Sequence, residues 1–123
     1  MSDPSFELGR RTDKLPAPPS IVFKSLTEWQ HPQARPWLAL LDDEIDPHVL
    51  ESVRPTLVVW SSIWPRTPDQ RIRFDLEPDD GSGTKLTWTL TSRTPLDDPS
   101  AVGHRRYRLN HLLWADLRYS YGN

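Results

Sequence analysis

The sequence predicts an α+β domain in which a curved antiparallel β-sheet wraps around a long C-terminal helix. Three features predict this architecture. Residues 71–77 and 85–91 alternate between apolar and polar, and a glycine-containing loop joins them. Residues 56–64 are rich in β-formers, and residues 101–121 show helical periodicity. Because only this last segment is long and apolar enough to cover a sheet face, we expect the sheet to grip it.

The composition is that of one folded unit. The 123 residues suit a single domain spanning 1–123, with residues 1–5 flexible. A net charge of −2 gives no general attraction for nucleic acid or anionic membrane, so we expect neither partner. The absence of cysteine excludes disulfides and thiol nucleophiles. Residues 1–14 lack the apolar core of a secretion signal, and no apolar run could span a bilayer, so we expect a cytoplasmic protein.

The first third of the chain predicts a strand and two short helices. A mostly polar strand over residues 6–14 ends at the proline-rich stretch 15–19. Proline suits the first turn of a helix, so a helix begins near residue 19 and continues to the His-Pro pair at 31–32. A second short helix is expected over residues 33–41, with Trp37, Leu40 and Leu41 on one side.

The middle of the chain predicts the remaining strands. After an acidic connection at residues 42–47, a short strand is expected over 48–53 and a central one over 56–64. The two alternating stretches form a hairpin that pairs Phe74 with Trp88 and Glu77 with Lys85. Both apolar sets then face the same side.

The final helix, residues 101–121, carries two neighbouring apolar stripes. One contains Val102, Leu109, Leu113 and Leu117, and the other contains Tyr107, Trp114 and Tyr121. Arg106 and Asn110 fall between the two stripes. A polar pair inside an apolar arc needs partners, which either the protein or a ligand can supply.

This order of elements resembles the START-like (SRPBCC) superfamily of helix-grip proteins, which includes polyketide cyclase-like proteins, lipid-transfer domains and Hsp90-ATPase-activator homologues. The resemblance is carried by LPAPPSIVF at residues 15–23 with the following Leu26-Thr27, by VVWSS at 58–62 and by GTKLTW at 83–88. It implies a pocket for hydrophobic ligands between the sheet and the C-terminal helix. The chain departs from the family pattern between Leu41 and Val53, where it is shorter, which implies a smaller sheet or a partly closed pocket.

With the family's strand phase, the pocket would bind a small hydrophobic or aromatic molecule. Its expected ligand-binding residues are Trp60, Ser62, Trp64, Phe74, Trp88, Arg106, Tyr107, Asn110 and Trp114. The alternative is an aromatic core that fills itself, which packing density favours. A strand slipped by one residue would instead expose Trp60 and Trp64 and predict an interface, with the protein acting as an interaction module and a possible homodimer.

Arg106 and Asn110 offer directional donors for a carboxylate or carbonyl at the pocket mouth. The competing interpretation is a helix-to-sheet anchor that uses Asp116, Ser62 or backbone carbonyls. No nucleophile elbow surrounds any serine and no catalytic motif is present, so binding without chemistry is favoured over enzymatic activity. A polyketide cyclase-like enzyme is the remaining alternative, with Arg106, Asn110 and Asp116 polarising a carbonyl.

Two charged clusters have simpler explanations than a binding site. Asp42, Asp43, Glu44, Asp46 and His48 lack the spacing of a calcium loop, so we interpret them as a solvated charged loop and expect no metal or cofactor. The basic run at residues 104–108 is scattered around a helix, which favours a solvated helix start over a nucleic-acid site.

Overall fold

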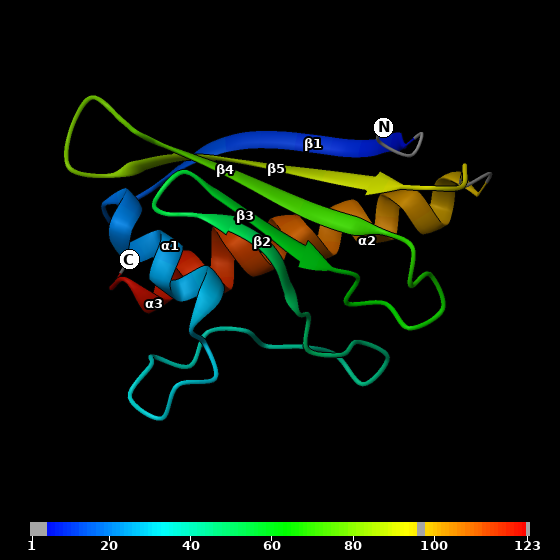
Figure 1. The fold of residues 1–123 in the computed structure, drawn as a ribbon, viewed down its shortest axis with the longest axis horizontal. Coiled ribbons are helices and arrows are strands. Elements are labelled where there is room, and N and C mark those ends of the chain that lie inside the picture. The colour runs from blue at the N-terminus through cyan, green and yellow to red at the C-terminus, as the bar shows by residue number, and fades with distance from the viewer. Residues whose placement is uncertain (1–4, 96–97, 123) are drawn as a thin grey trace.

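A computed structural model describes residues 5–95 and 98–122 and confirms the α+β prediction. The expectation that residues 1–5 are flexible falls largely outside this part of the chain. Five strands form one antiparallel sheet in the order β1-β5-β4-β3-β2, and a long C-terminal helix lies along it (Figure 1). The elements are β1 (Phe6–Leu15), α1 (Pro19–Thr27), β2 (Val49–Val53), β3 (Leu57–Ser61), β4 (Arg71–Pro78), β5 (Thr84–Ser92), α2 (Pro99–His111), η1 (Leu112–Leu117) and α3 (Arg118–Ser120).

The β4–β5 hairpin has the predicted register. Phe74 lies opposite Trp88 and Glu77 lies opposite Lys85. In the connecting loop, one Asp79 carboxylate oxygen accepts hydrogen bonds from the backbone N–H groups of residues 81 and 83, at 2.7 and 3.1 Å. This side-chain cap holds the turn, and strict alternation then places the apolar residues of both strands on the inner face.

The strand phase that the sequence predicts is also correct. Val58, Trp60 and Trp64 are buried, so the alternative of a slipped strand with exposed tryptophans is wrong. The inner face of the sheet packs against the C-terminal helix and α1. Fully buried residues at this interface include Ile72, Phe74, Leu86, Leu90, Leu109, Leu112, Leu113 and Leu117.

The shortened region before β3 forms a single edge strand. β2 pairs only with β3 and is followed by a tight connection into it. All five β2 residues are exposed. β3 is an interior strand as predicted but ends at Ser61, because the Ser62 hydroxyl accepts from the Trp64 backbone N–H at 2.9 Å and turns the chain away.

The predicted second helix, residues 33–41, is wrong. Turns at residues 29–34 are followed by extended chain. Pro36 has no N–H to donate and disfavours helical geometry in the residue before it. Instead, the Trp37 indole N–H donates to the Ser25 carbonyl at 3.0 Å, and its ring stacks on Trp60 with the centroids 6.1 Å apart. Tertiary packing of one tryptophan therefore decides the path of this segment.

The C-terminal helix forms as predicted and buries Leu109, Leu113 and Leu117 of the first stripe, but the second stripe begins outside the core. Arg108 is buried with its neighbour Leu109, whereas Tyr107 is 63% exposed and Arg106 is exposed. The placement of Tyr107 and Arg106 toward the interior is therefore wrong. Beyond these residues, the helix changes to i→i+5 bonding over η1, which rotates later residues relative to an ideal helix.

Candidate functional site

The expected pocket residues on the sheet have partners within the protein. The Trp60 indole N–H donates to the Leu26 carbonyl at 2.8 Å, and its ring meets Phe74 edge-on with centroids 4.7 Å apart. The Ser62 hydroxyl both donates to and accepts from the Trp64 backbone, at 3.0 and 2.9 Å. The sheet thus brings these residues together as a packed aromatic core, and ligand binding by them stays a prediction.

Asn110 anchors two tryptophans. Its side-chain oxygen accepts the indole N–H of Trp88 at 3.1 Å and that of Trp114 at 3.2 Å. Arg106, expected to act with Asn110, lies elsewhere: its alkyl stem covers Gly9, where an added Cβ would sit 2.8 Å from the Arg106 Cγ. Of the two interpretations of Asn110, the geometry favours the helix-to-sheet anchor.

The buried charge of the helix is Arg108. Its guanidinium makes a bidentate salt bridge with the Glu44 carboxylate. Nε donates to Oε2 at 2.9 Å, and Nη2 donates to Oε1 at 2.8 Å. Glu44 was expected in a solvated loop, and that expectation is wrong for this residue. Burial raises the pKa of its carboxyl, but hydrogen bonds from Arg108 and the Leu41 backbone N–H outweigh burial and hold the pKa below its ordinary value.

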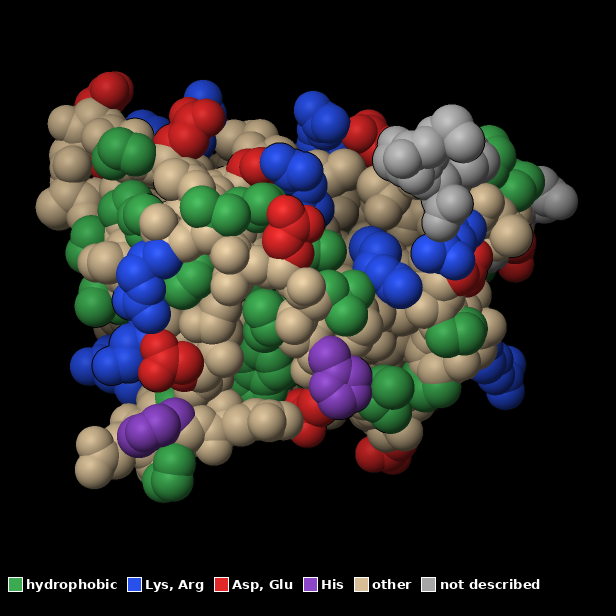
Figure 2. Space-filling model, viewed as in Figure 1, with side chains coloured by type: hydrophobic (Ala, Val, Ile, Leu, Met, Phe, Trp, Pro, Cys, Tyr) green, Lys and Arg blue, Asp and Glu red, His purple; other side chains and the backbone are tan. Residues whose placement is uncertain are grey.

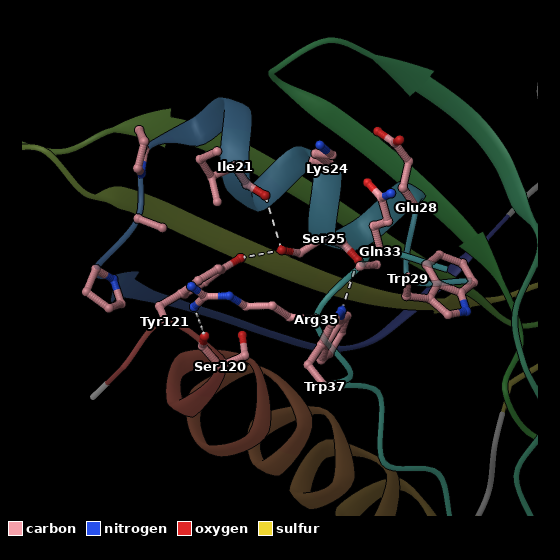
Figure 3. A pocket seen from close by; sticks show the side chains of 14 residues that line it. Ile21, Lys24, Ser25, Glu28, Trp29, Gln33, Arg35, Trp37, Ser120 and Tyr121 are labelled. Carbon is pink, nitrogen blue, oxygen red and sulfur yellow. Dashed lines mark hydrogen bonds between the residues drawn. The ribbon is translucent and has the colours of Figure 1, made fainter. Parts of the chain in front are cut away.

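A pocket of about 400 Å³ opens beside α1 rather than between the sheet and the long helix (Figure 3). Two stretches far apart in the sequence form it: residues 16–37, which comprise α1, the prolines before it and the loop after it, and the end of the C-terminal helix. Its lining residues are Pro16, Ala17, Pro18, Ile21, Lys24, Ser25, Glu28, Trp29, Gln33, Ala34, Arg35, Trp37, Ser120 and Tyr121.

Three aromatic side chains line this pocket. Trp29 and Trp37 both contact the buried Trp60, at centroid distances of 5.3 and 6.1 Å, which ties the pocket to the core. The Tyr121 hydroxyl donates to the Ser25 hydroxyl at 2.8 Å. Burial raises the pKa of the Tyr121 phenol to about 12, so this group stays neutral at ordinary pH.

The charged and amide side chains of the pocket are Lys24, Glu28, Gln33 and Arg35. Arg35 extends from the loop toward the helix end and donates to the Ser120 carbonyl at 2.5 Å (Figure 3). This contact joins the loop to the last turn of the chain. The pocket therefore combines an aromatic surface with charged side chains, the arrangement typical of small-molecule sites.

Sequence reasoning missed this location for a clear reason. It assigned residues 33–41 to a helix, whereas the pocket needs that segment as an extended loop. The available signal was the pair Trp29 and Trp37 flanking a stretch with two prolines, since prolines disfavour a continuous helix between them. Tyr121 was included in an aromatic stripe, although its partner Ser25 lies 96 residues away.

Charges of both signs are mixed on one face of the molecule (Figure 2). Within residues 5–95 and 98–122, no three His, Asp or Glu side chains gather in a way that would hold a metal ion. In the same part of the chain, no helix has the length and apolar character needed to cross a membrane.

Comparison with solved structures identifies the fold. CalU16 from Micromonospora echinospora superposes with a TM-score of 0.61 and 16% identity, over 89% of this chain and 82% of that one. The Aha1 dimer from Colwellia psychrerythraea gives 0.63 and 15%, over 89% and 91%. The chain has the helix-grip fold. An HSP90 activator from Plasmodium falciparum gives 0.57 and 17%, over 92% and 90%.

This is the fold that the sequence pattern predicts. No protein-family profile matches this sequence, and no curated protein matches it either. At identities of 15–17%, the three structures establish the architecture alone. What the domain does must be argued from its own site.

Proposed function

We propose that this helix-grip domain binds a small hydrophobic or aromatic molecule, and that it does so in the pocket beside α1. The observation that carries the proposal is that Trp29, Trp37 and Tyr121 all line one space of about 400 Å³. By contrast, the aromatic residues between the sheet and the long helix are buried against each other. The proposal therefore keeps the ligand class predicted from the sequence and moves its location.

The chemistry of the pocket supports this proposal. Its volume falls within the range of small-molecule sites, roughly 300–1,000 Å³. The Trp37 indole N–H and the Tyr121 hydroxyl already have protein partners, at 3.0 and 2.8 Å. These two rings can therefore offer apolar faces to a ligand with their own polar atoms paired. The Trp29 indole N–H differs, because it is buried and has no hydrogen-bond partner among the described residues, and a ligand with an acceptor could pair with it.

A fluorescence titration with N-phenyl-1-naphthylamine, a neutral aromatic probe, tests the proposal. We expect saturable binding that is lost in Ala34→Phe, which fills the pocket. Ala115→Phe is the matched control, because Ala115 is exposed on the C-terminal helix and does not line the pocket. Binding unchanged in Ala34→Phe would contradict the location, and no saturable binding to the wild type would contradict the function.

A second candidate function is protein interaction through the β2 edge as a homodimer. All five β2 residues are exposed, including Val49, Leu50 and Val53, and an exposed apolar edge strand invites pairing with another strand. The Aha1 protein from Colwellia psychrerythraea, which has a similar fold, is a dimer. Native mass spectrometry separates the candidates, because one spectrum reports retained ligand and subunit number. A dimer that Leu50→Lys converts to a monomer would favour the interaction.

The cyclase-like enzyme has less support. Of its three proposed polar residues, Arg106 is exposed, Asn110 holds two indoles, and Asp116 lies 3.5 Å from His111. They do not converge on the pocket beside α1. A cytoplasmic location stays a prediction from the sequence.

A further inference from the structure

We infer that the pocket beside α1 selects an amphipathic ligand, an aromatic or aliphatic body that carries one anionic group such as a carboxylate or sulfonate. This inference rests on the proposed function and adds a rule of selectivity to it. The structure assigns the anionic group to Arg35, with Lys24 as a second positive charge on the pocket wall, and the apolar body to the aromatic side chains of the lining.

The charge balance of the pocket is positive. Lys24, Glu28 and Arg35 are its charged lining residues. The Glu28 carboxylate lies 4.0 Å from Arg54, which is outside the lining, so this negative charge already has a counter-ion. Within residues 5–95 and 98–122, Lys24 makes no side-chain hydrogen bond or ion pair and Arg35 contacts no carboxylate. Two basic side chains thus remain available to an anion.

Arg35 is the better placed of the two. Its side chain crosses toward the helix end, where one N–H donates to the Ser120 carbonyl at 2.5 Å (Figure 3). A guanidinium has five N–H donors in a planar fork, so several remain for an anionic ligand. The backbone bond holds the guanidinium in place, which lowers the ordering cost when an anion binds.

The Tyr121 phenol does not cancel this positive charge. The Arg35 guanidinium lies beside Tyr121, where it donates to the neighbouring Ser120 carbonyl (Figure 3), and its charge opposes the effect of burial on the pKa of the phenol. Because burial still raises the pKa to about 12, the phenol is uncharged wherever a carboxylate or sulfonate is ionised at ordinary pH. An anion at Arg35 therefore meets a cation and a neutral hydroxyl rather than a phenolate.

Two probes that share one ring system test this selectivity. N-phenyl-1-naphthylamine is neutral, and 8-anilinonaphthalene-1-sulfonate is the same arylamine with a sulfonate added. We expect the sulfonate to bind about tenfold more tightly at low salt, as one charge-assisted contact would give, and to lose much of this preference at high salt. Arg35→Gln should remove the preference, measured as the ratio of the affinities of the two probes for the same variant.

Controls separate selectivity from folding. Arg66→Gln changes the same residue type at an exposed position outside the pocket and should alter neither affinity. Arg35→Lys should restore part of the preference, and Lys24→Gln should weaken it if Arg35→Gln proves unstable. Equal affinity for both probes would overturn this inference and leave the pocket proposal standing. Failure of both probes to bind would overturn both.

Discussion

Replacing Glu44 by Gln tests the buried ion pair of this fold. The Glu44 side chain has no exposed surface and that of Arg108 is 6% exposed. The carboxylate accepts from Arg108 at 2.9 and 2.8 Å and from the Leu41 backbone N–H at 3.0 Å. The amide of glutamine keeps the shape but not the charge, and it turns a donor toward the guanidinium. Arg108 then remains as a buried charge without a counter-ion.

Such a loss costs about 3–5 kcal/mol in the free energy of unfolding. For a domain of this size, that corresponds to a fall in melting temperature of roughly 10–20 °C. Urea unfolding at neutral pH, followed by tryptophan fluorescence, measures the cost directly. Asp46→Asn is the matched control, because Asp46 is exposed in the same segment and its loss should change stability by less than about 0.5 kcal/mol.

Two further variants test whether the cost arises from the unpaired charge of Arg108. Replacing both partners, with Glu44→Leu and Arg108→Met together, should recover most of the loss, because no buried charge is then left unpaired. Arg106→Leu should be tolerated, since Arg106 is exposed. A cost below about 1 kcal/mol for Glu44→Gln, or a double variant as unstable as the single one, would refute the assignment of Glu44 and Arg108 as a buried, mutually dependent pair.

Three more predictions follow from single contacts. Lowering the pH should remove the contribution of the ionised Glu44 carboxylate to the free energy of unfolding. Its folded pKa lies below the ordinary 4.5, so the contribution is present above about pH 4.5 and disappears as the pH falls through the folded pKa. Glu44→Gln should lack this pH dependence in unfolding measured across the same pH range. Asn110→Ala should cost about 1–3 kcal/mol, because it leaves buried indole donors unpaired, whereas Asn110→Asp keeps the acceptor and should cost less in the same assay. Gly83→Ala should also destabilise, by about 1–3 kcal/mol in urea unfolding, because the added Cβ would lie 2.5 Å from the Leu15 carbonyl oxygen; Gly81→Ala, with its nearest neighbour at 3.6 Å, is the control.

The sheet could be predicted well from the sequence. Alternation along residues 71–77 and 85–91, together with one short loop, fixes which residues face inward and which lie opposite. The observed pairing of Phe74 with Trp88 follows from that periodicity alone. The edge strand β2 was harder to place, because all of its residues are exposed and no buried face marks it.

The site could not be predicted in the same way. A tertiary pair such as Glu44 and Arg108 joins residues 64 positions apart, and neither helical periodicity nor loop composition specifies it. The pocket depends on residues 33–37 leaving the helical state, which Pro36 and the packing of Trp37 decide. Local patterns identify the aromatic residues, but their arrangement around one space follows from the folded chain.

Ligand binding beside α1 can be tested by an NMR titration of the tryptophan indole N–H resonances with N-phenyl-1-naphthylamine. Trp29 and Trp37 line the pocket beside α1, whereas Trp88 and Trp114 share Asn110 between the sheet and the long helix. Binding in the pocket beside α1 predicts large, saturable shifts of the Trp29 and Trp37 resonances and little change in those of Trp88 and Trp114. Shifts confined to Trp88 and Trp114 would contradict it and place the ligand between the sheet and the helix.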